Sequence, residues 1–204
     1  MMPPTTVIVM AKAPVAGYAK TRLIPALGAE GAADLADRLL QHAVTQALAA
    51  NLGPVELCCA PDHHHPAFSN LCARPGLVWA DQGEGDLGAR MARAFERRLA
   101  SGGSALMIGT DAPALDAAVL RQAAEALTQT DAVFVPALDG GYALIGLRRA
   151  VPALFSAMAW STPTVMARTR ERLAAAGLRH TELPPLADID EAADLIHLPE
   201  GFLP

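Results

Sequence analysis

Three cationic side chains, Lys12, Lys20 and Arg22, lie within one short segment of this 204-residue sequence. They follow directly on the apolar run 7–11, which predicts a buried strand. A proline and Gly17 exclude a regular helix between them, so backbone N–H groups and cations gather where the strand ends. A diphosphate requires such a setting, and each close cation–phosphate pair contributes about 4 kcal/mol before desolvation. The glycine–lysine spacing of a P-loop is absent, and a solvated basic loop is the alternative interpretation.

A carboxylate, Asp111, stands just beyond another apolar run, residues 105–108. Pro113 prevents the chain from continuing at once as a helix. Hard divalent cations such as Mg²⁺ prefer carboxylate oxygens and share the phosphate oxygens of a bound substrate. Asp111 is therefore the candidate metal ligand. The alternative is that it caps the next helix, but Asp116 is better placed for that role.

Two glycine-rich segments, residues 83–88 and 139–142, follow other apolar runs. Glycine lets the backbone approach a ligand or make a tight turn, and taken alone the turn is the simpler interpretation. Asp86 is also placed to cap the helix that follows. The acidic residues 188–191 precede the last predicted helix, and capping accounts for only one of them.

The elements that must position these residues alternate between short apolar runs and longer amphipathic segments, the pattern of an α/β domain. Continuous apolar strands predict a mostly parallel sheet covered on both faces. Ligands of such sheets bind at the carboxyl ends of the strands, where the candidates lie. The predicted strands are residues 7–11, 55–60, 77–80, 105–108, 132–135, 142–147 and 181–183, and the predicted helices are residues 32–50, 86–99, 116–127, 162–176 and 190–197.

Composition predicts one folded domain over residues 1–204. Hydrophobic residues make up 52% and charged residues 18% of the chain, which excludes a disordered protein. The formal net charge of −5 argues against a nucleic-acid partner, and no apolar run has the length of a membrane span. Three cysteines without metal spacing predict buried free thiols in a reducing cytoplasm. The histidine run 63–65 lies beside prolines, which favours a surface loop over a zinc site.

Six segments carry a signal that none carries alone: residues 10–23, 85–91, 108–115, 136–147, 160–165 and 188–195. In this order, and over nearly the whole chain, they resemble the bacterial radical-SAM/selenodomain-associated, or arsenosugar-biosynthesis-type, glycosyltransferases. That family belongs to the nucleotide-diphospho-sugar transferase superfamily. The resemblance implies an α/β fold of the glycosyltransferase A type, a three-layer sandwich with a mostly parallel central sheet. It also implies a divalent metal, Mg²⁺ or Mn²⁺.

By position, the resemblance implies which residues contact the donor, the acceptor and the metal. Those assigned to the nucleotide and its phosphates are Lys12, Gly17, Lys20, Arg22, Gly85, Asp86 and Gly88. Those assigned to the sugar or acceptor side are Asp139, Gly140 and Gly141. The metal is assigned to Asp111 and Asp190, and catalysis to Asp111 and Asp139. Residues 110–113 read Thr-Asp-Ala-Pro where this fold often has Asp-X-Asp.

We therefore expect a metal-dependent glycosyltransferase that uses a nucleotide-sugar and a small-molecule acceptor. The first alternative is a nucleotidyltransferase that resembles the phospholactate or molybdopterin guanylyltransferases and attacks the α-phosphate of a nucleoside triphosphate. The second alternative is a nucleotide-binding protein without catalysis. Turnover of a nucleotide-sugar, turnover of a triphosphate, or binding without turnover separates the three.

Overall fold

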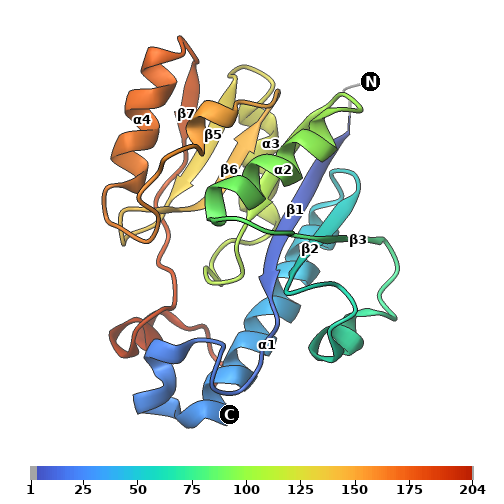
Figure 1. The fold of residues 1–204 in the computed structure, drawn as a ribbon, viewed down its shortest axis with the longest axis vertical. Helices are drawn as coiled ribbons and strands as arrows, with labels where there is room; N and C mark the ends of the chain where they lie inside the picture. Colours follow the sequence, from blue (N-terminus) through green and yellow to red (C-terminus); the bar gives the residue numbers. More distant parts are fainter. Residues whose placement is uncertain (1–3, 204) are drawn as a thin grey trace.

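A computed structural model describes residues 4–203, so positions 1–3 and 204 of the predicted domain lie outside the described residues. Within the described part, a seven-stranded sheet forms the centre of the molecule (Figure 1). Its strands are β1 (Thr5–Lys12), β2 (Val55–Ala60), β3 (Leu77–Asp81), β4 (Ser104–Ile108), β5 (Ala132–Pro136), β6 (Tyr142–Leu147) and β7 (His180–Glu182). The α-helices are α1 (Ile24–Ala50), α2 (Leu87–Leu99), α3 (Ala117–Ala126) and α4 (Val165–Ala175). Shorter 3₁₀ helices are η1 (Thr21–Leu23), η2 (Pro66–Leu71), η3 (Pro152–Leu154) and η4 (Ala192–His197).

The strands follow the order β3-β2-β1-β4-β6-β5-β7. Neighbouring strands run parallel except at β6, which is antiparallel to both β4 and β5. The predicted mostly parallel sheet is therefore confirmed. Because β6 is reversed, the turn that precedes it lies at the same edge of the sheet as the carboxyl ends of β1 and β4.

Helices cover both faces of the sheet, which gives the predicted three layers (Figure 1). One core lies between the sheet and helices α1 and α3, and the other lies between the sheet and helices α2 and α4. Val7 and Val9 of β1 belong to the first core and Ile8 to the second. Both faces of β1 are thus buried, which explains why its sequence is a continuous apolar run rather than an alternating one.

The first helix is longer than the predicted residues 32–50 because it begins at Ile24 and bends at Gly28 (φ 74°, ψ 168°). This first turn packs into a small core that contains Leu23, Leu35 and Ile189. The predicted terminal helix is the 3₁₀ helix η4, which lies near the start of α1 (Figure 1). No helix of the described residues is long and apolar enough to cross a membrane.

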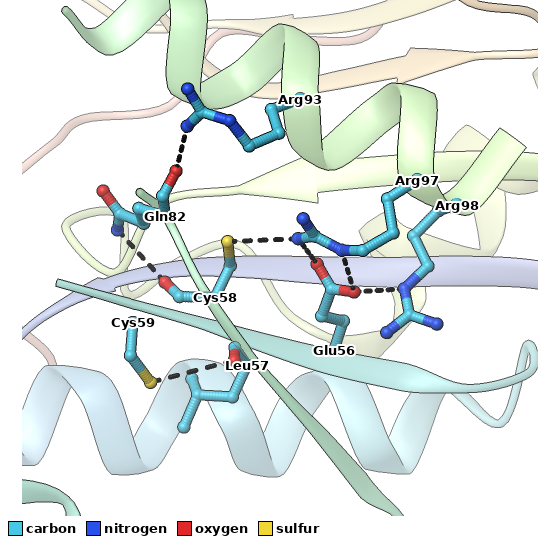
Figure 2. A network of polar contacts seen from close by, with 8 residues as sticks. All are labelled: Glu56, Leu57, Cys58, Cys59, Gln82, Arg93, Arg97 and Arg98. Atoms are coloured by element: carbon cyan, nitrogen blue, oxygen red, sulfur yellow. Dashed lines mark hydrogen bonds and ion pairs between the residues drawn. The ribbon is translucent and has the colours of Figure 1, made fainter. Parts of the chain in front are cut away.

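A buried carboxylate, Glu56, interrupts the apolar run of β2 and is 0% exposed. Two arginines from the last turn of α2 hold it (Figure 2). Arg97 donates from Nη2 to Oε1 at 2.5 Å and from Nε to Oε2 at 3.2 Å, and Arg98 donates to Oε2. The two ion pairs compensate the buried negative charge of Glu56, and they connect α2 to the sheet.

Candidate functional site

A cleft of about 650 Å³ opens at the carboxyl ends of the central strands. Its walls include the basic loop after β1, the loop between β3 and α2 with the start of α2, the end of β4, the turn before β6, and the segments before α4 and η4. These segments are far apart in the sequence, and the sheet brings them together. Of the predicted site residues, those that line the cleft are Lys12, Lys20, Arg22, Asp111, Asp139, Gly141 and Asp190.

The basic loop leaves β1 at Lys12 and turns back before η1. Gly17 has φ +81°, a left-handed conformation that glycine adopts at little cost. Lys12 is exposed, and its Nζ donates to the carbonyl of Tyr18 at 3.0 Å. The loop thus folds on itself and leaves the ammonium group of Lys12 at the cleft wall.

Lys20 and Asp111 form an ion pair across the cleft. The distance from Lys20 Nζ to Asp111 Oδ1 is 2.6 Å, and the side chain of Lys20 is only 7% exposed while that of Asp111 is 50% exposed. Asp111 follows β4 directly, and its backbone carbonyl accepts a 2.8 Å hydrogen bond from Ile189 N–H. The loop after β1, the end of β4 and the segment before η4 therefore meet at this pair.

The turn before β6 places Asp139 at the other side of the cleft. Its Oδ1 accepts a 2.8 Å hydrogen bond from Gly141 N–H, which fixes the turn. Gly140 has φ +92°, and a Cβ atom there would lie 2.2 Å from the carbonyl oxygen of Pro163. The paired glycines therefore serve a close approach between this turn and the start of α4. The ligand role assigned to Gly140 and Gly141 stays a prediction.

A carboxylate that the sequence did not single out, Asp188, lines the same cleft. Burial raises the pKa of this carboxyl group, and the charges of Asp139, Asp194 and Asp111 raise it further. Asp188 therefore shares the electrostatic environment of both predicted catalytic acids. The only sequence signal for it was its place in the acidic run 188–191.

Asp190, the predicted second metal ligand, has a different partner. Its Oδ2 accepts a 2.6 Å hydrogen bond from Arg22 Nη1, and Glu191 lies 3.7 Å from the same nitrogen. Asp190 lines the cleft, but its charge is matched by Arg22. The charge of Asp111 instead contributes to the raised pKa of Asp188.

Of the predicted 85–88 segment, Leu87 lines the cleft, and the nucleotide roles assigned to the other three residues stay predictions. Gly85, Asp86 and Gly88 are absent from the residues that line it. Asp86 caps α2, because its Oδ1 accepts from Ala89 N–H at 2.8 Å. Gly88 packs against the segment before α4, where a Cβ atom would lie 2.4 Å from the carbonyl oxygen of Phe155. Their physical role here is local packing and capping.

Gln82, rather than those residues, is the polar group that reaches the cleft from this region. It is 7% exposed, and its Nε2 donates to the carbonyls of Ala11 and Cys58 at 3.0 Å. Figure 2 shows Arg93 of α2 donating to the backbone carbonyl of Gln82. The loop between β3 and α2 is therefore fixed to the sheet by side-chain hydrogen bonds.

An aromatic wall closes the cleft beside the turn at Asp139. Tyr142 and Trp160 both line it. Burial raises the pKa of the Tyr142 phenol well above its usual range, so this group stays neutral at physiological pH. Trp160 Nε1 is buried and has no hydrogen-bond partner among the described residues. The cleft thus combines a cationic loop, a set of carboxylates and an aromatic wall.

The donor chemistry of the cleft suits a hard divalent cation. Asp111, Asp139 and Asp188 supply carboxylate oxygens, and the ammonium group of Lys20 already stands as a cation against Asp111. No three His, Cys, Asp or Glu side chains of residues 4–203 form a complete cation cage. Mg²⁺ commonly binds through one or two carboxylates and completes its shell with substrate phosphates and water. The residues present therefore fit a cation that binds together with a phosphate ligand.

Residues 39–162 match the family described as "Uncharacterized protein conserved in bacteria (DUF2064)". The chain belongs to the DUF2064 family. This DUF2064 chain is also similar to a solved structure from Desulfovibrio desulfuricans G20, described as a candidate nucleotide-diphospho-sugar transferase. The two share 30% sequence identity, over 95% of this chain and 85% of that one, with a TM-score of 0.87. No protein of curated function matches the sequence.

Two more distant structures share the fold of this DUF2064 member. One is CMP:2-keto-3-deoxy-manno-octonic acid synthetase in complex with CTP, with 12% identity over 96% of each chain and a TM-score of 0.60. The other is Rv0371c from Mycobacterium tuberculosis H37Rv in complex with manganese, with 18% identity, a TM-score of 0.57, and coverage of 98% of this chain and 100% of that one. The fold is thus the one found in nucleotidyl and nucleotide-sugar transferases, as the sequence predicts.

Proposed function

We propose that this protein is a metal-dependent transferase that uses a nucleotide-sugar donor and a small-molecule acceptor. The observation that carries the proposal is the meeting of Lys20 and Asp111 in one cleft with Lys12 and Arg22. A donor diphosphate needs cations for its oxygens and a carboxylate to anchor a bridging metal ion. The similarity to the D. desulfuricans protein supports the same class of donor.

Each part of the cleft has a role in this proposal. Lys12, Lys20 and Arg22 neutralise the phosphates, and Asp111 with Asp188 holds the cation. The cation, when bound, offsets the negative charge that grows on the leaving phosphate. Asp139 and the aromatic wall hold the sugar and the acceptor near the donor, which makes the transfer effectively unimolecular. The narrower resemblance, to the arsenosugar-biosynthesis-type enzymes, is part of this proposal and rests on the six sequence segments alone.

A second candidate, nucleotidyl transfer, is favoured by the number of cations. Three basic side chains line one side of the cleft, and a nucleoside triphosphate carries more negative charge than a diphosphate. In this case the acceptor attacks the α-phosphate, and pyrophosphate leaves. The two reactions therefore differ in the product that is released.

The test measures which nucleotide products form. The protein is first screened by thermal shift against nucleotide-sugars and nucleoside triphosphates with Mn²⁺, because a ligand at 100 times its Kd adds about 2.7 kcal/mol of stability. Ligands that bind are then incubated with acceptor mixtures. Release of nucleoside diphosphate from a nucleotide-sugar supports the proposal, and release of pyrophosphate from a triphosphate supports the second candidate. Tight binding without turnover would show that the protein binds nucleotides without catalysis.

The variant Asp111→Asn tests the role of this carboxylate, because it keeps the shape of the side chain and removes its charge. Turnover is expected to fall on the order of 10²-fold or more, as when one electrostatic stabiliser is removed from other active sites. The melting temperature is expected to stay close to that of the wild type. A folded Asp111→Asn variant with full activity would overturn the role proposed for this carboxylate.

A further inference from the structure

The ammonium group of Lys20 occupies an unusual position for a lysine. Its backbone is left-handed (φ 48°), and its side chain is only 7% exposed. Nζ lies 2.6 Å from Asp111 Oδ1 and also donates to the carbonyl of Ile189. Fixing a lysine in a left-handed backbone costs energy, since L residues other than Gly, Asn and Asp rarely adopt it. The surrounding contacts must therefore hold the ammonium group in place.

The carboxylates of the cleft explain why a fixed cation is favourable there. Asp111, Asp139 and Asp188 all line this cleft, and Asp111 is in direct contact with the ammonium group of Lys20. Like charges in one cleft disfavour one another, and a nearby positive group offsets that repulsion. Lys20 therefore supplies against Asp111 part of the positive charge that a divalent ion would supply there.

We infer that Lys20 is an internal counter-ion that competes with the divalent cation for Asp111. This inference rests on the proposed function and concerns how that site is regulated. A cation on either oxygen of Asp111 would stand beside the ammonium group, and the two positive charges repel each other. The free protein therefore binds the metal weakly. A phosphate ligand draws Lys20 towards its own oxygens and releases Asp111 to the cation, so ligand and metal strengthen each other's binding.

The sequence makes this inference unusually accessible to experiment, because Lys12 and Lys20 are the only lysines in the chain. Both lie on the same loop and both line the cleft. Lys12 is exposed and bonds to the carbonyl of Tyr18, and within residues 4–203 it makes no ion pair. Lys12 is therefore a matched control for Lys20.

The first experiment titrates the purified protein with Mn²⁺ alone and follows binding by calorimetry and by the electron paramagnetic resonance signal of free Mn²⁺. Lys20→Asn removes the ammonium group and tolerates the left-handed backbone. It is expected to raise the affinity for Mn²⁺ by about 5–150-fold, the usual range of coupling between sites. Lys20→Arg, which keeps the charge, and Lys12→Asn are expected to bind Mn²⁺ like the wild type. Unchanged or weaker binding by Lys20→Asn would overturn the inference.

The second experiment uses the wild-type protein and does not depend on how a variant folds. A limiting amount of an amine-reactive ester is added with or without saturating Mn²⁺, and labelling of each lysine is measured by peptide mass spectrometry. Mn²⁺ is expected to increase labelling of Lys20 several-fold and to leave Lys12 unchanged. Equal labelling of Lys20 in both conditions would show that the cation does not displace it, and the inference would be wrong.

The outcomes separate this inference from the proposed function. If the wild type and Lys20→Asn bind Mn²⁺ equally well, and Asp111→Asn does not bind it, the metal site stands and the competition is refuted. If no variant binds Mn²⁺, both are refuted. If Lys20→Asn alone gains affinity while no nucleotide is turned over, the competition stands and the transferase proposal fails.

Discussion

Removing both arginines that bind Glu56 should lower the free energy of unfolding far more than removing an exposed arginine such as Arg121. The carboxylate is 0% exposed, and both of its oxygens accept hydrogen bonds from Arg97 or Arg98 (Figure 2). The double variant Arg97→Ala/Arg98→Ala leaves this charge buried without a partner, which costs about 3–5 kcal/mol. Arg98→Ala alone removes one charge-assisted hydrogen bond and should cost about 1.5–3 kcal/mol.

Urea unfolding followed by circular dichroism measures these differences. For a chain of this size, 1 kcal/mol corresponds to about 2–4 °C in melting temperature, so the double variant should melt about 6–20 °C lower. Arg121→Ala is the control, because this arginine is exposed on α3 and makes a single 3.3 Å contact with the carbonyl of Ala49. Its effect should stay within about 0.5 kcal/mol.

A third substitution tests the electrostatic explanation itself. Adding Glu56→Gln to the double variant removes the uncompensated charge while it keeps the size of the side chain. Stability should then recover by at least about 1 kcal/mol, because a buried neutral amide costs less than a buried carboxylate. A further loss of stability in the triple variant, or a double variant that costs less than about 1 kcal/mol, would refute the reasoning.

Three further predictions follow from the same structure. A thiol reagent at pH 8 should rapidly modify the exposed Cys72 only, because burial raises the pKa of Cys58 to about 11 and of Cys59 to about 12; fast modification of a second thiol would contradict this. Asp188→Asn, measured in EDTA, should raise the melting temperature at pH 7. Burial and neighbouring acids raise the pKa of this carboxyl, so its ionised form destabilises the native state, and the gain should shrink as the pH falls towards 3.8. Gly140→Ala should lower the free energy of unfolding by about 1–3 kcal/mol, because its left-handed backbone and the facing proline carbonyl leave no room for a methyl group; equal denaturant midpoints would argue against it.

The strands and helix starts could be predicted from sequence because their signals are local. Residues 7–11 form a buried strand, and Asp86 and Asp116 both cap the helices they precede. The direction of β6 could not be predicted, because residues 142–147 have the same apolar character in either orientation. Glu56 shows a second limit, since its partners lie 41 and 42 positions further along the chain.

For the site, too, the position of a residue at a strand end could be predicted from sequence, but the direction of its side chain could not. The rule that ligands bind at strand ends predicted that Lys20 and Asp111 would share a cleft, and they do. The choice between Asp188 and Asp190 depends on which way each side chain points in a segment without regular structure. That direction is set by contacts such as the hydrogen bond from Ile189 N–H to the Asp111 carbonyl, and no sequence pattern encodes it.

The central place of β1 has a consequence for how the chain folds as it is synthesised. β1 pairs on one side with β2, Val7 against Val55, and on the other with β4, Thr5 against Ser104. One edge of β1 therefore stays open while the roughly 50 residues between β2 and the end of β4 are made, about 2–10 s at 5–20 residues per second. Open strand edges invite pairing with other chains. The strand that anchors the basic loop is thus also where a nascent chain is most exposed to misassembly, and slow translation of residues 61–108 would prolong that exposure.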